Sequence, residues 1–274
     1  MSSRYVSQKR NICVPIAPDP DEIFDRAVEE GERRLDQSFL ELTATSFIAG
    51  FTIVFGIATL GVVDALVEPQ FGEVAHIAGA LTFATGVVFL VVGRTELFNE
   101  NFFDPAAKAV AQDGSWLLGP LLRLWALTLV VNLVGGFLFA LVFAVEGVLP
   151  SGSAHALART AEEIVHRPTR GMFASAIVGG ALVSLLSYLL EAVNSVRSRI
   201  TMAYIVGFLL ALGPFDHVVV TAIHVFFGFL FDAAIGYGAL GETVVVSTAG
   251  NLVGGIGLVT FTHVAQVRGA EDDD

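Results

Sequence analysis

Long apolar runs separated by short polar segments occupy most of the chain. Each of six runs is close to or longer than the ~20 residues that an α-helix needs to cross a bilayer. Strands of a transmembrane barrel are about ten residues of alternating polarity, whereas these runs are continuous. The pattern predicts an all-α membrane protein with a turn at Glu68–Gln70 and a short exposed helix at Ala156–Ile164. The six predicted transmembrane helices are Thr43–Val63, Val74–Val92, Leu117–Val145, Met172–Leu190, Thr201–Phe231 and Thr243–His263.

The fifth run is interrupted in its middle. The sequence Gly-Pro-Phe-Asp-His at 213–217 breaks the helical pattern. Every unpaired backbone group in hydrocarbon costs several kcal/mol, and ionisable side chains are also costly at bilayer depth. A break that carries Asp216 and His217 is therefore predicted to be a functional site.

The polar segment after the second run, at 93–105, fits neither a helical nor a strand period. It is predicted to form a loop that restarts as a short helix, with Asp104 as the N-cap and Pro105 at the first helical position. A plain cytoplasmic loop is the simpler interpretation of this segment taken alone. Its apolar side chains weigh against that interpretation, namely Leu97, Phe98, Phe102 and Phe103.

An internal repeat relates the two halves of the chain. The string Asn-Leu-Val-Gly-Gly begins at Asn132 in the third run and again, 119 residues later, at Asn251 in the sixth. An interruption precedes each string at nearly the same distance, at Gly93 and at Gly213. Two units of three helices must enter the membrane from opposite sides. The repeat therefore predicts a 3+3 inverted architecture with broken second and fifth helices and a site near the midplane.

Composition and charge support a membrane protein and predict its orientation. Hydrophobic residues make up 54% of the chain and charged residues only 15%, which is outside the range of a soluble domain. Twelve of the 15 Lys and Arg lie on the face that holds the N-terminal segment, the second and fourth loops and the C-terminal tail. By the positive-inside rule, this multi-pass protein of the cell (inner or plasma) membrane is predicted to have both termini in the cytoplasm.

Three regions are predicted from the distribution of charge. Residues 1–42 form a cytoplasmic N-terminal segment, 43–266 a six-helix transmembrane domain and 267–274 an acidic cytoplasmic tail. Apolar positions within Asp21–Glu41 recur at helical spacing, so this stretch is either an amphipathic helix on the membrane surface or a solvated helix leading into the first span. The net charge of −12 argues against nucleic acid as a partner.

In combination these motifs resemble the formate/nitrite transporter family, and most closely its poorly characterised branch of unknown substrate. The likeness rests on the six spans, Glu-Leu-Phe at 96–98, the break at 213–217 and Gly-Asn-Leu-Val-Gly-Gly at 250–255, and it covers nearly all of Thr43–Arg268. The resemblance implies an aquaporin-like protomer in a homopentamer, with a pore through each subunit. It also implies transport of small monovalent anions such as formate or nitrite, often with a proton.

The resemblance assigns roles to individual residues. His217 falls on the family's central pore histidine, Phe83 on an aromatic constriction, and Asn99 on a threonine that usually contacts the histidine or the substrate. Thr221 and Ser184 stand where the family usually has asparagine. The predicted pore and substrate-binding residues are His217, Asn99, Phe98, Leu97, Phe83, Leu210, Thr221, Phe215 and Glu96, with Asn132, Asn251 and Ser184 supporting the pore loops.

The chemistry of a histidine suits an anion pore. An unperturbed imidazole titrates near pH ~6.5, so His217 can attract an anion and then supply it with a proton. The second half of the broken fifth helix would direct its positive end toward the same point. His224 lies seven residues beyond His217 on nearly the same helical face, as either a second pore histidine or a satisfied interhelical one. Asn132 and Asn251 are predicted to tether the opposite broken segments by hydrogen bonds.

The sequence favours transport over catalysis. It contains no Gly-x-Ser-x-Gly or His-Glu-x-x-His motif, and we expect neither enzyme activity nor a cofactor. His217 and His224 lack an evident third ligand, so we expect no metal. Two alternatives stay open. One is a pore for neutral solutes such as glycerol or water, although the paired Asn-Pro-Ala strings of aquaporins are absent, and the other is a membrane scaffold that transports nothing.

Overall fold

The computed structural model describes residues 18–112 and 116–271, and this part of the chain is all-helical. Residues 1–17 and 272–274, which belong to the predicted N-terminal segment and acidic tail, lie outside the described residues. Five helical segments of the described part are long and apolar enough to cross a membrane. They are α2 (Phe39–Phe71), α3 (Val74–Gly93), α5 (Leu118–Phe143), α7 (Thr169–Glu191) and Gly238–Gly269, which contains α10 (Gly238–Leu252), the π-helical segment η2 (Val253–Thr260) and most of α11 (Phe261–Glu271).

The remaining predicted run, Thr201–Phe231, is divided between two helices. α8 (Val196–Leu212) ends before the Gly-Pro pair, and α9 (Val218–Leu230) begins directly after His217. Ser195 caps α8, because its hydroxyl accepts a hydrogen bond from the third residue of the helix at 3.0 Å. The division falls where proline and glycine predict it, since proline has no N–H to continue a helix.

The first transmembrane helix extends beyond its apolar run. The Ser38 hydroxyl caps its start by accepting the N–H of Glu41 at 3.2 Å, and Gly72, with φ +57°, ends it. The turn predicted at Glu68–Gln70 is therefore wrong, because Pro69 lies inside the last turns of α2. Proline removes one backbone hydrogen bond from a helix. Because α2 ends at Gly72 in any case, the loss of this bond costs the helix little stability.

An N-terminal helix packs on a short helix from the segment after α3. α1 (Pro20–Leu35) ends short of its predicted boundary, and its buried side, including Ala27, faces α4 (Phe103–Ala111). A Cβ atom on Gly31 would clash with the backbone of Asp104, so glycine permits this close approach. α1 thus lies directly against one of the two interrupted segments.

α6 (Ser153–Val165) is buried, whereas the sequence predicts a short exposed helix in this region. Its residues Ala156, Leu157 and Ala161 are almost inaccessible and pack against α9 and α2. The prediction of exposure is wrong because small alanine side chains on one face let neighbouring helices approach closely. The polar side of α6 carries Arg159.

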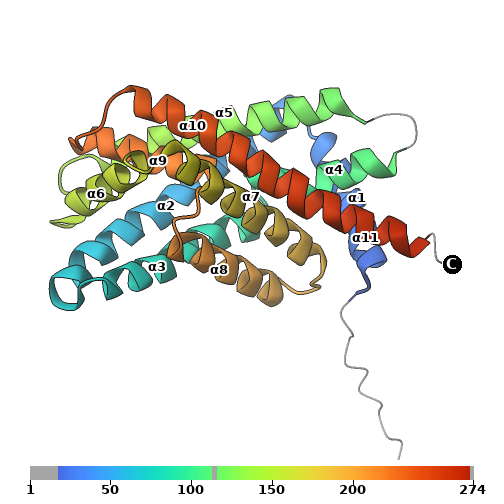
Figure 1. Ribbon diagram of the computed structural model, residues 1–274, viewed down its shortest axis with the longest axis horizontal. Helices are drawn as coiled ribbons and strands as arrows, with labels where there is room; N and C mark the ends of the chain where they lie inside the picture. Colours follow the sequence, from blue (N-terminus) through green and yellow to red (C-terminus); the bar gives the residue numbers. More distant parts are fainter. Residues whose placement is uncertain (1–17, 113–115, 272–274) are drawn as a thin grey trace, which may run out of the picture.

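Different helices lie at the two ends of the molecule. Figure 1 places α1, α4 and α11 at one end of the molecule, and α6 with the α2–α3 turn at the other. The core between them is apolar and includes Ile57, Phe83, Leu186 and Phe227. The segments that follow α3 and α8 both reach this core, where Leu97 and Val218 belong to the same apolar cluster.

Candidate functional site

The segment after α3 enters the core of the protein. α3 ends at Gly93, Arg94 adopts a left-handed φ of +51°, and the short 3-10 helix η1 (Phe98–Asn101) leads into α4. The apolar side chains that weigh against a plain solvent-exposed loop are buried, with Leu97 and Phe98 only 3% and 2% exposed.

Two carboxylates of this segment face α1. Asp104 is not the N-cap that the sequence predicts, because α4 begins at Phe103, two residues before the predicted start, and has no side-chain cap; Asp104 instead pairs with Arg34 at 3.3 Å. Glu96 is buried and accepts hydrogen bonds from Gln37 at 2.9 Å and from Arg33 at 3.1 Å. The side chain of Glu96, a predicted pore residue, therefore contacts the N-terminal helix.

The segment between α8 and α9 is fixed by an arginine that follows α6. Arg167 donates to Asp216 Oδ1 at 2.6 Å and to the backbone carbonyl of Pro214 at 3.0 Å. Ser175 of α7 donates to the same carbonyl and accepts the N–H of Asp216 at 3.0 Å. Thr221 donates to Asp216 Oδ1 at 3.3 Å. The carboxylate beside His217 is thereby engaged by a cation and a hydroxyl.

Asn132 and Asn251 hold the two interrupted segments in the same way. The side-chain oxygen of each accepts one backbone N–H, and the amide nitrogen of each donates to two backbone carbonyls. Each asparagine tethers the interruption that precedes it in the chain, which corrects the prediction that it tethers the opposite one. The partners of Asn132 are the N–H of Phe98 (2.9 Å) and the carbonyls of Glu96 (3.0 Å) and Ser46 (2.8 Å), and those of Asn251 are the N–H of Val218 (2.9 Å) and the carbonyls of Asp216 (2.7 Å) and Ala176 (2.7 Å).

A small closed cavity lies between the two interruptions. Its volume is about 10 Å³, and among the predicted pore residues it is lined by Leu97, Leu210 and His217. His217 is 1% exposed, and neither nitrogen of its ring has a hydrogen-bond partner among the described residues. A space of this size holds at most one water molecule. Buried polar groups are nearly always hydrogen-bonded, which makes this imidazole a candidate site.

A wider pocket of about 910 Å³ lies on the side of the molecule that carries α6. Phe83, Leu210, Phe215, Thr221 and His224 are the predicted pore residues that line it. Its lining also contains more acidic than basic side chains. The carboxylates are Asp64, Glu68, Glu73, Glu163 and Asp216, and the guanidinium groups are Arg159 and Arg167.

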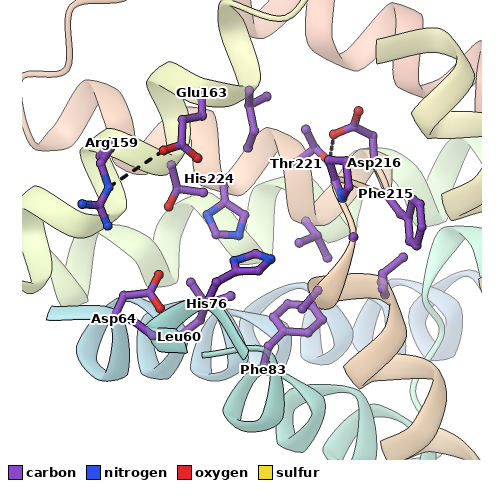
Figure 2. Close-up of a pocket in the computed structure, with 18 of the residues that line it drawn as sticks. Leu60, Asp64, His76, Phe83, Arg159, Glu163, Phe215, Asp216, Thr221 and His224 are labelled. Atoms are coloured by element: carbon purple, nitrogen blue, oxygen red, sulfur yellow. Dashed lines mark hydrogen bonds and ion pairs between the residues drawn. The ribbon is translucent and has the colours of Figure 1, made fainter. Parts of the chain in front are cut away.

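Two histidines line the wider pocket. Figure 2 shows His224, His76 and Asp64 toward one side of the pocket and Phe215 and Asp216 toward the other. His76 Nε2 is 2.9 Å from the carbonyl of Leu212, whereas His224 Nδ1 has no partner among the described residues. In the described part of the chain no three His, Cys, Asp or Glu side chains are arranged to hold a metal ion.

Three further predicted residues line neither the closed cavity nor the wider pocket. The ring of Phe98 packs edge-on against that of Phe102, with 4.9 Å between the centroids. Asn99 is fully buried, and neither atom of its amide has a hydrogen-bond partner among the described residues. Ser184 donates to the carbonyl of Gly255 at 3.1 Å and so supports the sixth run rather than a pore loop.

The chain is similar to a known protein family and to individual proteins of that family. The model of the family described as formate/nitrite transporter matches residues 21–265. The chain belongs to the formate/nitrite transporter family. It is similar to the inner membrane protein YfdC of Escherichia coli K12, at 22% identity over 90% of this chain and 78% of that protein. It is also similar to the formate channel BtFdhC of Bacillus thuringiensis, at 23% identity over 90% of this chain and 94% of that protein.

Solved structures share the fold of this family member. One described as an FNT family ion channel has a TM-score of 0.77 at 18% identity, covering 90% of this chain and 99% of that chain. A pentameric formate channel with formate bound has a TM-score of 0.68 at 16% identity, covering 83% and 97%. The protein is therefore a multi-pass membrane protein of a transporter family.

Sequence reasoning missed two buried acids of this transporter-family chain. Glu100 is 4% exposed and lines the closed cavity, and Asp64 is 7% exposed and lines the wider pocket. Each interrupts apolar or aromatic neighbours in the sequence, Glu100 between Phe98 and Phe102 and Asp64 near the end of the first run. That interruption is the signal that could have identified them.

The acidic group Glu30 organises the arginines of α1. Arg33 donates to Glu30 at 2.6 and 2.9 Å, and Arg34 donates to it at 3.1 Å. Burial opposes the charge of this carboxylate, but the hydrogen bonds and charges of the two arginines outweigh burial and lower the pKa of Glu30 to about 2. The same two arginines reach Glu96, at 3.1 and 3.7 Å.

Proposed function

We propose that this protein is a channel or proton-coupled transporter for small monovalent weak-acid anions of the formate and nitrite type, with a pore in each subunit centred on His217. The observation that carries the proposal is the buried imidazole of His217, which lines the closed cavity and has no hydrogen-bond partner among the described residues. Imidazole is the side chain that exchanges a proton near neutral pH.

The surroundings of His217 favour an anion. α9 begins at the next residue and is 13 residues long, so its positive end lies beside the cavity. The carboxylate of the preceding residue, Asp216, is paired with Arg167 at 2.6 Å. We infer that the imidazolium of His217 attracts the anion and then protonates it. The neutral acid passes the apolar side chains of Leu97, Leu210 and Phe83 at much lower cost than a bare anion would.

The charge of the wider pocket favours passage with a proton. Five carboxylates and two arginines line it, so its potential is negative. A negative potential lowers the local concentration of a monovalent anion and raises that of protons by the same factor, which leaves the concentration of the neutral acid unchanged. A pore that passes the acid as an anion with its proton is therefore compatible with this acidic pocket, whereas a bare-anion conductance would be reduced by it.

Proteoliposome flux of formate and of nitrite, measured from pH 5 to 8, tests the proposal. We expect uptake to rise as the pH falls and to carry protons, and we expect His217→Ala to reduce it by at least about tenfold. The control is His166→Ala, because this exposed histidine follows α6 and its ring bonds the Glu162 carbonyl of that helix, at 2.8 Å.

Unchanged flux in His217→Ala would contradict the mechanism. Swelling in glycerol or water without anion flux would favour the neutral-solute pore. A protein that passes no solute, and that tolerates a polar residue at Phe98, would be a scaffold.

We further propose that the fold is a 3+3 inverted repeat, with broken second and fifth helices. In this scheme α3 and α4 correspond to α8 and α9. The matching hydrogen bonds of Asn132 and Asn251 support the scheme, since each asparagine bonds the chain at equivalent points of its interruption. Residues 43–266 then form the channel domain, with both termini in the cytoplasm, which reporter fusions at each terminus would test.

A homopentamer in the lipid bilayer is proposed from the similarity to a pentameric formate channel. Exposed apolar side chains on α5 are consistent with contacts to lipid or to a second subunit, as at Leu122, Val130 and Leu138. Native mass spectrometry of the detergent-solubilised protein would measure the number of subunits.

A further inference from the structure

Two unpartnered ionisable side chains line one closed cavity. Glu100 of η1 lines it together with His217, and Oε1 of Glu100 has no hydrogen-bond partner among the described residues. Burying a carboxyl group without a partner costs free energy, so chance burial of both groups beside one space is a poor explanation. Their shared location points to chemistry that uses both.

The carboxyl and the imidazole come from different positions of the two interruptions. Asn132 accepts the N–H of Phe98, and Asn251 accepts the N–H of Val218. The residue just before each of these N–H groups is Leu97 in the first interruption and His217 in the second. The residue two positions after that N–H is Glu100 in the first and Val220 in the second. All four line the cavity. Each interruption thus contributes one ionisable and one apolar side chain to the cavity, and the acid and the base occupy different positions of their interruptions.

The charges around Glu100 leave its side chain without a neutralising partner. Arg34 of α1 donates to the backbone carbonyl of Glu100 at 2.8 Å and pairs with the carboxylates of Glu96 at 3.7 Å and Asp104 at 3.3 Å. α7 contributes the uncharged hydroxyl of Ser187, which donates to the same carbonyl at 2.9 Å. The guanidinium of Arg34 is therefore shared among buried acids and does not pair with the carboxyl group of Glu100. This arrangement favours a bound proton on Glu100.

We propose that Glu100 is a proton-relay residue, which exchanges a proton between His217 and water at the end of the molecule that carries α1. The inference rests on the proposed function. When an anion widens the cavity, the O–H bond of the Glu100 carboxyl breaks and an N–H bond forms on the imidazole, leaving a carboxylate and an imidazolium. The imidazolium gives that proton to the anion. A proton from water on the α1 side then restores the carboxyl group of Glu100.

Formate flux of Glu100→Gln in proteoliposomes across pH 5 to 8 tests the relay. Glutamine keeps the size of the side chain but cannot release a proton. We expect a loss of about tenfold or more at pH 8, where protons in water are scarce, and flux within about twofold of the wild type at pH 5. Glu100→Asp should restore part of the flux at pH 8. A purely structural role would lower flux by the same factor at every pH.

The matched control is Glu32→Gln, which removes an exposed carboxylate of α1 paired with Lys108 at 2.9 Å and should leave the pH profile unchanged. Infrared difference spectra give a readout that needs no transport: a protonated-carboxyl band present in the wild type should be missing from Glu100→Gln. A wild-type pH profile in Glu100→Gln, or an unchanged carboxyl band, would overturn the relay. Absence of formate and nitrite flux in the wild type would instead overturn the proposed function and, with it, the role in transport.

Discussion

Asn251 should be one of the most costly polar side chains to remove. It is fully buried and makes three hydrogen bonds, to the N–H of Val218 and to the carbonyls of Asp216 and Ala176, at 2.7 to 2.9 Å. These bonds connect the segment before α9 to α10 and α7. Asn251→Leu keeps a similar volume and removes all three.

The hydrogen bonds set the expected size of the loss. Each buried hydrogen bond contributes roughly 0.6–1 kcal/mol in a membrane protein, so three predict a destabilisation of about 2–3 kcal/mol. Asn251→Asp should cost more, because its carboxylate would face the carbonyls of Asp216 and Ala176 that now accept N–H donors. The side chain of Ser247, one turn earlier on α10, is equally buried but has no hydrogen-bond partner among the described residues.

Thermal unfolding of the detergent-solubilised protein measures the difference. We expect the order of stability to be wild type and Ser247→Ala highest, then Asn251→Leu, then Asn251→Asp. Asn132→Leu should match Asn251→Leu, because Asn132 makes the same set of bonds. The reasoning would be refuted if Asn251→Leu were as stable as Ser247→Ala.

Three further predictions concern packing, pH and the second interruption. Gly254→Ala should lower the unfolding temperature, because a methyl group there would meet a backbone carbonyl of α7, whereas Gly257→Ala, where nothing lies within 4 Å, should not. Glu30→Gln should destabilise the protein at pH 7. Unfolding measured from pH 7 to 3 should show this difference shrinking below about pH 4.5, because a carboxylate with a pKa near 2 stabilises the fold above its unfolded pKa and loses that effect as the pH falls toward 2. Arg167→Gln, which removes the guanidinium that pairs with Asp216 and bonds the Pro214 carbonyl, should lower formate flux by about tenfold, whereas Arg170→Gln, at an exposed position of α7, should leave it unchanged.

Much of the fold can be predicted from hydrophobicity and from glycine and proline. The apolar runs predict the long helices, and the Gly-Pro pair at 213–214 predicts the end of α8. Pro69 misleads because a proline so close to the end of a helix removes little, and α2 ends two residues beyond it in any case. The prediction for α6 is wrong because polar residues interrupt its sequence, whereas its alanines lie on one face and let that face be buried. Local patterns do not report such contacts with distant helices.

The site residues differ in how clearly the sequence marks them. His217 could be identified because an ionisable residue beside a helix break is costly and because the family motif coincides with it. The signal for Glu100 is weaker, since only its position between Phe98 and Phe102 marks it, while His217, which lines the same cavity, is 117 residues away and no local spacing connects the two. The Glu-Leu-Phe motif of the family predicts Glu96 as a pore residue together with Leu97, but successive residues of an extended segment point in opposite directions, and the carboxylate of Glu96 faces α1.

The two interruptions share a pattern of backbone hydrogen bonds but carry different side chains. Each interruption carries an acid at the residue whose backbone carbonyl accepts a hydrogen bond from the asparagine. This acid is Glu96 in the first interruption and Asp216 in the second. Each acid is paired with an arginine from outside its interruption, Arg33 at 3.1 Å and Arg167 at 2.6 Å. These equivalent acids therefore do not oppose an anion at the cavity. The next residue differs, leucine in the first interruption and His217 in the second. Equivalent hydrogen bonds fix the backbone, and the side chains that differ decide where a proton can bind.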